Sequence, residues 1–80
     1  MEINILSGEV IGAAIEVHRL LGPGLLESAY ELALERELVL RGVRVERQKP
    51  VALEYKGVDL GDGFRIDLLV DGCLIVEIKA

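Results

Sequence analysis

Two acidic residues and a lysine alternate with apolar residues in the C-terminal stretch, residues 63–80. Asp67 belongs to the segment GFRIDLLV, and Glu77 and Lys79 belong to LIVEIKA. This period of two predicts two strands joined at Asp71-Gly72, because successive side chains of a strand leave opposite faces. Two carboxylates on one face would offer Mg²⁺ the oxygen ligands it prefers, and the lysine could hold a phosphate or an activated water.

The loop between these strands decides whether the two acids share a face. A two-residue loop, Asp71-Gly72, would put Asp67 and Glu77 on opposite faces. A three-residue loop, 70–72, brings both acids to one face and sets Arg65 opposite Glu77. Burial favours the three-residue loop, because a one-residue slip would carry charges into the apolar face. A salt-bridged sheet surface without a metal is the alternative interpretation of the same cluster.

Length and composition limit the class of protein. Eighty residues allow a single domain, 1–80, and 51% apolar residues are enough for a core. No run of eighteen apolar residues or secretion signal is visible, and the one cysteine, Cys73, is expected to fill space in a strand. These features predict a cytoplasmic protein without a membrane partner. The net charge of −5 argues against non-specific nucleic-acid binding but permits a metal-dependent site, which must be acidic.

The elements that must position the acids follow in chain order. The spacing predicts a helix over 6–21, capped by Ser7, and a second helix over 25–41 with Gly24 as its N-cap. From residue 43 the period changes to two, which predicts a meander of four or five strands, interrupted at Pro50 and with a bend or bulge at Gly61-Asp62-Gly63. The expected fold class is α+β, with two N-terminal helices packed on a mainly antiparallel sheet. In the first helix the predicted buried stripe is Val10, Ala14, Val17 and Leu21, flanked by Ile11 and Ile15.

Other polar residues have a structural and a functional interpretation. Glu27 and Tyr30 share one face of the second helix, as a helix-end glutamate and a half-buried tyrosine or as part of the acidic site. Glu31 is expected on the wet face of that helix. The lone His18 lacks a partner at zinc spacing. A basic run favours a solvated strand face over a phosphate-tracking patch; it comprises Arg41, Arg44, Arg47 and Lys49.

Several segments together resemble a known family. GLLESAY, residues 24–30, resembles the pattern that names the GxxExxY proteins, and the segments EVHRLLGPG, RVERQ, RIDLLV and LIVEIKA keep the order of that family. The resemblance runs from about residue 6 to residue 80. The family is similar to the PD-(D/E)XK nuclease superfamily, whose core resembles that of restriction endonucleases and continues after the acid-x-Lys strand with a helix and a strand. The chain is therefore expected to hold only the first part of that core.

The resemblance implies roles for individual residues. Asp67 would be the first acid and Glu77 the second, with the Ile78 carbonyl as a further ligand of one or two Mg²⁺ or Mn²⁺ ions. Lys79 would position the water or stabilise charge on the phosphate. Glu27 would be the acid carried by the helix. Arg65 and Gln48 would touch phosphate.

Two functions follow as expectations. The first is a Mg²⁺-dependent nuclease-like domain that hydrolyses phosphodiester bonds of DNA or RNA. The alternative is a non-catalytic interaction or assembly module that retains the nuclease scaffold. The chain ends at Ala80 within or beside a strand, so an uncovered strand edge is expected there, and with it either a shortened chain or a homo-oligomer that completes the sheet.

Overall fold

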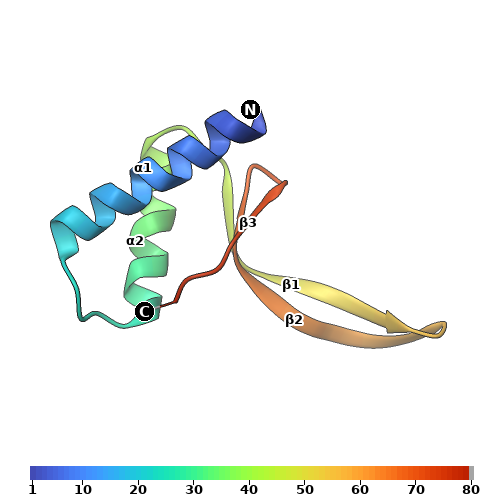
Figure 1. The fold of residues 1–80 in the computed structure, drawn as a ribbon. Coiled ribbons are helices and arrows are strands. Elements are labelled where there is room, and N and C mark those ends of the chain that lie inside the picture. The colour runs from blue at the N-terminus through green and yellow to red at the C-terminus, as the bar shows by residue number, and fades with distance from the viewer. Residues whose placement is uncertain (80) are drawn as a thin grey trace.

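The computed structural model describes residues 1–79, which form two helices followed by a three-stranded antiparallel sheet (Figure 1). The elements are α1 (Ile3–Leu21), α2 (Glu27–Leu40), β1 (Val45–Tyr55), β2 (Val58–Val70) and β3 (Leu74–Val76). In the sheet the strand order is β1-β2-β3. The predicted α+β class is confirmed, whereas the prediction of four or five strands is wrong for the described residues.

The sheet has fewer strands because Pro50 and the segment Gly61-Asp62-Gly63, which were expected to separate strands, lie inside the long strands β1 and β2. β1 runs through Pro50, which is tolerated because β1 is the outer strand of the sheet. β2 runs through Gly61-Asp62-Gly63, where the pairing with β1 shifts register instead of ending. Glycines at such shifts are typical of β-bulges, which bend a strand without terminating it.

α1 begins earlier than the sequence predicts. Its cap is Glu2, whose side chain accepts hydrogen bonds from the backbone N–H groups of Asn4, at 2.9 Å, and Ile5, at 3.1 Å. Ser7, the predicted cap, lies inside the helix. A glutamate can replace the usual short N-cap residue here because its carboxylate reaches two unpaired N–H groups at the positive end of the helix.

α2 begins at Glu27, two residues later than predicted. Its N-cap is Leu26, which offers no side-chain hydrogen bond, so the prediction of Gly24 as the cap is wrong. The preceding loop is fixed by Tyr30 instead. The Tyr30 hydroxyl donates to the Gly22 carbonyl at 2.7 Å and accepts from the Leu25 N–H at 3.2 Å. The tyrosine thus replaces the missing cap by tying the loop to the first turns of the helix.

The core forms where both helices cover one end of the sheet. Its buried residues come from α1, α2, β2 and the loop before β1: Leu6, Ala13, Val17, Leu34, Leu38, Val43, Leu68 and Val70. Val17 is buried as predicted, but Ala14 is exposed and Ile11 and Ile15 are 60% and 64% exposed. The buried stripe of α1 is therefore centred on Leu6, Ala13 and Val17. None of the helices in residues 1–79 is both long enough and apolar enough to cross a membrane.

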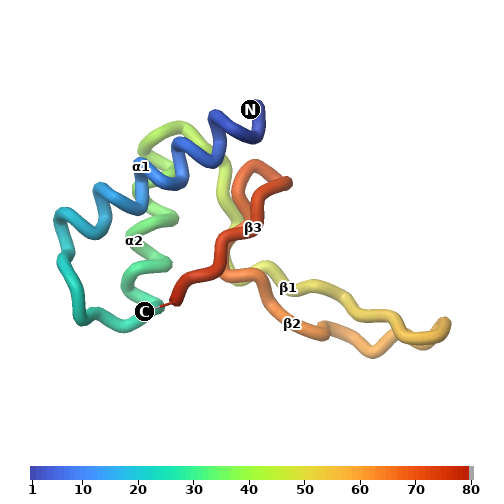
Figure 2. Tube along the Cα trace, in the orientation of Figure 1, coloured from blue at the N-terminus to red at the C-terminus, as the bar shows by residue number. Residues whose placement is uncertain are grey.

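The β1–β2 ribbon extends well beyond the helices (Figure 2). β3 pairs only with the last three residues of β2, Leu68–Val70. The remainder is a two-stranded projection, residues 49–65, which we call the arm. Every arm residue is exposed except Val51, which is half-buried. The acids predicted to act in chemistry lie where the arm joins the rest of the sheet.

Candidate functional site

The turn between β2 and β3 has the odd number of residues that a shared acidic face requires. Val70 pairs with Leu74, so the loop comprises Asp71, Gly72 and Cys73, one residue later than predicted. Asp71 and Gly72 have φ of 53° and 69°, and the Cys73 N–H donates to the Val70 carbonyl at 3.1 Å. Cys73 is consequently an exposed turn residue and not a strand filler.

This register, continued by one residue, would set Asp67 against Glu77. The last regular pair is Leu68–Val76 on the apolar face, and β3 ends at Val76, so Glu77 lies one residue beyond the pairing. Alternation past Val76 would turn Glu77 to the opposite face, where the alternation of β2 places Asp67. The predicted opposition of Arg65 and Glu77 is wrong, because the loop starts one residue later than expected. The sharing of one face by the two acids does not depend on that difference, since both loops contain three residues.

A hydrogen bond fixes the first acid to the segment that carries the second. The Ile78 N–H donates to Oδ2 of Asp67 at 2.8 Å, in a half-buried position. β3 ends at Val76, so this bond continues the link between β2 and the chain beyond the last regular pair. In the part of the chain that the structure describes, Oδ1 of Asp67 stays available for another ligand.

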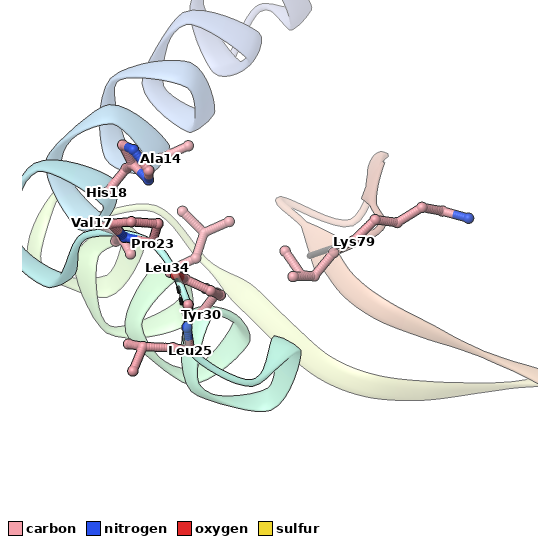
Figure 3. A pocket seen from close by; sticks show the side chains of 10 residues that line it. Ala14, Val17, His18, Pro23, Leu25, Tyr30, Leu34 and Lys79 are labelled. Carbon is pink, nitrogen blue, oxygen red and sulfur yellow. Dashed lines mark hydrogen bonds between the residues drawn. The ribbon is translucent and has the colours of Figure 1, made fainter.

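Lys79 lies at the rim of an apolar cavity of about 520 Å³. The cavity is lined by α1, by the loop before α2 and by α2 itself, with Ile78 and Lys79 on the other side. Figure 3 shows that the Lys79 side chain runs away from the helices. The lysine is exposed, and none of the ion pairs among residues 1–79 includes it. Its ammonium group is therefore accessible to an anion.

Glu27 is placed apart from the acid pair. It is the first residue of α2 and is exposed, and its neighbours Leu25 and Tyr30 line the same cavity as Ile78 and Lys79. Among residues 1–79, no three His, Cys, Asp or Glu side chains lie close enough together to hold a metal ion. The structure thus ties Asp67 to the segment that follows β3, and it does not gather Glu27 with the other acids.

Sequence reasoning missed a second glutamate of α2. Glu31 was expected on the wet face, yet it is only 7% exposed. Its Oε1 accepts a hydrogen bond from Nε2 of Gln48 at 2.6 Å and lies 4.0 Å from the Arg47 guanidinium. Glu27 and Glu35 lie four residues to either side of Glu31 on the same face of the helix, yet Glu27 is exposed and Glu35 half-buried. The spacing along the helix therefore does not single out Glu31.

Gln48 connects this buried glutamate with the acid face. In the β1–β2 register Arg47 pairs with Leu68 and Lys49 with Ile66, so Gln48 occupies the position opposite Asp67. Its φ of 55° lies in the left-handed region, where residues other than glycine are strained. The predicted contact of Gln48 with phosphate stays a prediction, but its amide nitrogen already has a partner in Glu31.

The basic run behaves as a solvated surface. Arg41 pairs with Glu37 at 2.9 Å, and Arg47 with Glu35 at 3.7 Å. Lys49 pairs with Glu46 at 2.7 Å, and this hydrogen bond lowers the pKa of Glu46 below its ordinary value. The favoured interpretation, a solvated strand face, is therefore confirmed for Arg47 and Lys49 on β1, whereas Arg41 is the C-cap residue of α2. Arg65 is exposed on β2, two residues from Asp67 and on the same face.

The donor set of the acid face fits a hard divalent cation. Asp67 lies on β2 and Glu77 directly follows β3, and the next residue, Ile78, donates its N–H to Asp67 and carries a carbonyl donor in the same segment. Mg²⁺ is commonly bound by one or two carboxylates, with water and substrate phosphate completing its six ligands. Oxygen donors without cysteine or histidine suit this ion better than zinc.

Comparison with known proteins agrees with this chemistry. Residues 4–80 match the sequence model of a protein family described as the PD-(D/E)XK nuclease superfamily. No curated protein and no solved structure gives a significant match. The family match covers almost the whole chain, including both helices and all three strands.

Proposed function

The chain belongs to the PD-(D/E)XK nuclease superfamily, and on that premise we propose that it hydrolyses phosphodiester bonds of DNA or RNA with Mg²⁺ or Mn²⁺ as cofactor. The supporting observation is the 2.8 Å hydrogen bond from the Ile78 N–H to Asp67, which holds the β2 acid against the segment 77–79. The finer likeness to the GxxExxY proteins, through residues 24–30, belongs to the same proposal.

The residues of the acid face have distinct roles in this proposal. Asp67, Glu77 and the Ile78 carbonyl would hold the metal ion, which when bound supplies a Lewis acid and a water of lowered pKa. Lys79 places a positive charge beside the phosphate and stabilises the charge that develops on it during hydrolysis. Arg65, on the same face as Asp67, would contact a neighbouring phosphate.

One helix residue, Glu31, and one strand residue, Gln48, support the strand that runs opposite Asp67. Glu31 holds the side chain of Gln48, and Gln48 fixes the β1 backbone opposite Asp67. We assign these two as positioning residues. Glu27 would join the acids only in the presence of metal and substrate, because it is exposed at the start of α2 and not gathered with them in the described residues.

Metal titration combined with a cleavage assay tests the proposal. Calorimetry with Mg²⁺ or Mn²⁺ is expected to show binding, and single- and double-stranded DNA and RNA are the substrates to compare. Asp67→Asn and Glu77→Gln should abolish metal binding and hydrolysis together. Lys79→Met should retain metal binding but lower turnover by about 10²-fold or more. Glu54→Gln, an exposed acid on the arm, is the matched control and should change neither.

A non-catalytic assembly module is the second candidate function. The observation that favours it is the lack of a three-acid cluster among residues 1–79. In this case the open edge of β3 would pair with another copy and complete the sheet. Absence of metal binding in the unmodified chain, together with unfolding that depends on protein concentration, would favour the module over the nuclease.

A cytoplasmic location is part of the proposal. Cys73 is a free, exposed thiol in the turn before β3. Exposed unpaired thiols persist in reducing compartments, where disulfides are rare.

A further inference from the structure

The arm has one apolar face, although nothing in residues 1–79 covers it. Between the pairs Val51–Phe64 and Ala52–Asp62, the chain moves one residue along β1 but two residues along β2. Between the pairs Ala52–Asp62 and Glu54–Asp59, it moves two residues along β1 but three along β2. Both extra residues therefore lie on β2, and β1 keeps its regular alternation. Val51, Leu53 and Tyr55 share one face as a result.

β2 contributes apolar partners to the same face. Phe64 pairs with Val51 and Val58 pairs with Tyr55. Leu53 lies so close to the β2 backbone that a Cβ at Gly63 would come within 2.7 Å of the Leu53 Cβ, so glycine permits this packing. The opposite face carries acids, which are Glu54, Asp59 and Asp62. The arm thus has the pattern of a sheet with one covered face and one wet face.

The apolar face continues the face that is buried in the core. Phe64 alternates with Ile66, Leu68 and Val70, which are all buried, and no register shift separates Phe64 from Ile66. The helices stop short of the arm (Figure 1). Phe64 is 57% exposed, Val58 58% and Tyr55 61%. A two-stranded ribbon with bare apolar side chains is marginal in water unless a further layer packs on it.

The exposed area matches one side of a dimer interface. The chain exposes 5494 Å². A compact monomer of 8.8 kDa would expose about 4,800 Å². The excess, about 700 Å², is close to the roughly 800 Å² that each partner covers in a stable protein–protein interface. Every arm residue except Val51 is exposed, so the arm contributes to this excess and covering the arm would reduce it.

The charges and edges of the arm indicate how a partner would pack. The arm holds three basic and three acidic residues, so it is neutral in a chain of net charge −5 and is the region where two copies repel each other least. Its edges carry Pro50, Lys49 and Lys56 and the two bulges, which are features that oppose edge-to-edge pairing. The apolar face is left as the surface of contact.

We propose that two copies of this chain associate through the apolar faces of their arms, packed sheet on sheet about a twofold axis. The surface consists of Val51, Leu53, Tyr55, Val58 and Phe64. It lies on the face of the sheet opposite Asp67 and Glu77, so the association leaves the acid face open. The proposal does not depend on nuclease activity.

Sedimentation velocity over a concentration series tests the association. The unmodified chain should be a dimer that dissociates on dilution, and Phe64→Glu should be monomeric at every concentration. Ile15→Glu is the matched control, because Ile15 is similarly exposed, at 64%, but lies on α1; it should leave the dimer intact. A monomeric unmodified chain would overturn the proposal. So would an Ile15→Glu monomer, or a Phe64→Glu dimer held together through α1 or the β3 edge.

Disulfide trapping gives a second measurement that does not depend on a destabilising charge. In a Cys73→Ser background, Leu53→Cys should form a covalent dimer on mild oxidation. Leu53 lies at the middle of the apolar face, between Val51 and Tyr55, and the middle of a surface that packs on its own copy lies next to the twofold axis. Ile15→Cys in the same background is the control and should stay uncrosslinked. Equal crosslinking of the two variants would refute the arm as the interface.

Discussion

At the scale of single residues, Tyr30 holds together the loop between the helices. Its hydroxyl bridges the Gly22 carbonyl and the Leu25 N–H, and the ring packs against the core. No side chain caps α2, so the Tyr30 hydroxyl fixes the loop at the start of this helix in place of a capping residue. The tyrosine of the GLLESAY segment is therefore explained by stability, without a part in chemistry.

We expect Tyr30→Phe to lower the free energy of unfolding by about 1–2 kcal/mol, because two hydrogen bonds of the hydroxyl are lost while the ring remains. Urea denaturation measures the change. Tyr55→Phe is the control, since Tyr55 lies 61% exposed on the arm, and it should change the free energy by less than about 0.5 kcal/mol. Equal effects of the two substitutions would mean that the loop does not depend on the Tyr30 hydroxyl.

Gly24 supports the same loop through its backbone. Its φ is 91°, and a Cβ there would meet no atom within 4 Å, so the cost of a side chain is conformational only. Gly24→Ala should therefore destabilise by about 1–2 kcal/mol. Gly8→Ala is the control: Gly8 also has open space but is helical, and alanine there should stabilise by up to about 1 kcal/mol. Thermal unfolding that shifts in the same direction for both variants would contradict this explanation.

At the scale of elements, α2 and β1 meet through a polar contact. The buried Glu31 accepts a 2.6 Å hydrogen bond from Gln48, and no buried side-chain N or O atom within residues 1–79 lacks a partner. A buried carboxylate needs such a donor, because removing the donor leaves a charge without compensation. This contact fixes how the helix sits against the strand that runs opposite Asp67.

Gln48→Ala should destabilise the chain by about 1.5–3 kcal/mol, because Glu31 loses its closest donor while staying buried. The neighbouring substitution Lys49→Ala breaks only the exposed pair with Glu46 and should cost less than about 1 kcal/mol. In a double-mutant cycle, Glu31→Leu with Gln48→Ala should cost less than the sum of the single changes. Additive costs would show that the two side chains do not act together.

Elements with a strong local signal were predictable from the sequence. The helix end at Gly22, the change of period at residue 43 and the odd loop before β3 follow from glycine, spacing and alternation, and the structure confirms them. The burial of Glu31 was not predictable, because it depends on Gln48, which lies seventeen residues away. The interruption at Pro50 was wrongly predicted, since the tolerance of an edge position is decided by the partner strand. The bend or bulge predicted at Gly61-Asp62-Gly63 is confirmed by the register shifts there.

Some features of the candidate site could likewise be predicted from the sequence, and others could not. The odd number of residues in the loop, on which a shared face for Asp67 and Glu77 depends, could be predicted from the sequence. The exact pairing of β2 with β3 could not be predicted from the sequence. It depends on whether Val70 belongs to the loop or pairs with Leu74. The position of Glu27 relative to the acids depends on how α2 docks on the sheet, which no local pattern determines.

At the scale of the whole molecule, the chain is a small core with a projection. The radius of gyration is 14.3 Å, against about 12 Å for a compact domain of this length. All eight residues of the buried core cluster lie outside the arm. The core and the arm therefore depend on different contacts. The core is covered by the helices, whereas we propose that the arm is covered by another copy of the chain.

Removal of the arm separates these two parts. Because Val51 pairs with Phe64, residues 52–63 can be replaced by Asn-Gly, a two-residue turn suited to an antiparallel pair. The shortened chain should fold cooperatively, since its buried core is intact, and should scatter as a monomer with a radius of gyration of about 11 Å. Its metal binding should match that of the full chain, because Asp67 and segment 77–79 lie outside the deleted residues. Small-angle scattering and calorimetry measure both properties; a shortened chain that is unfolded would show instead that the arm contributes to the stability of the core.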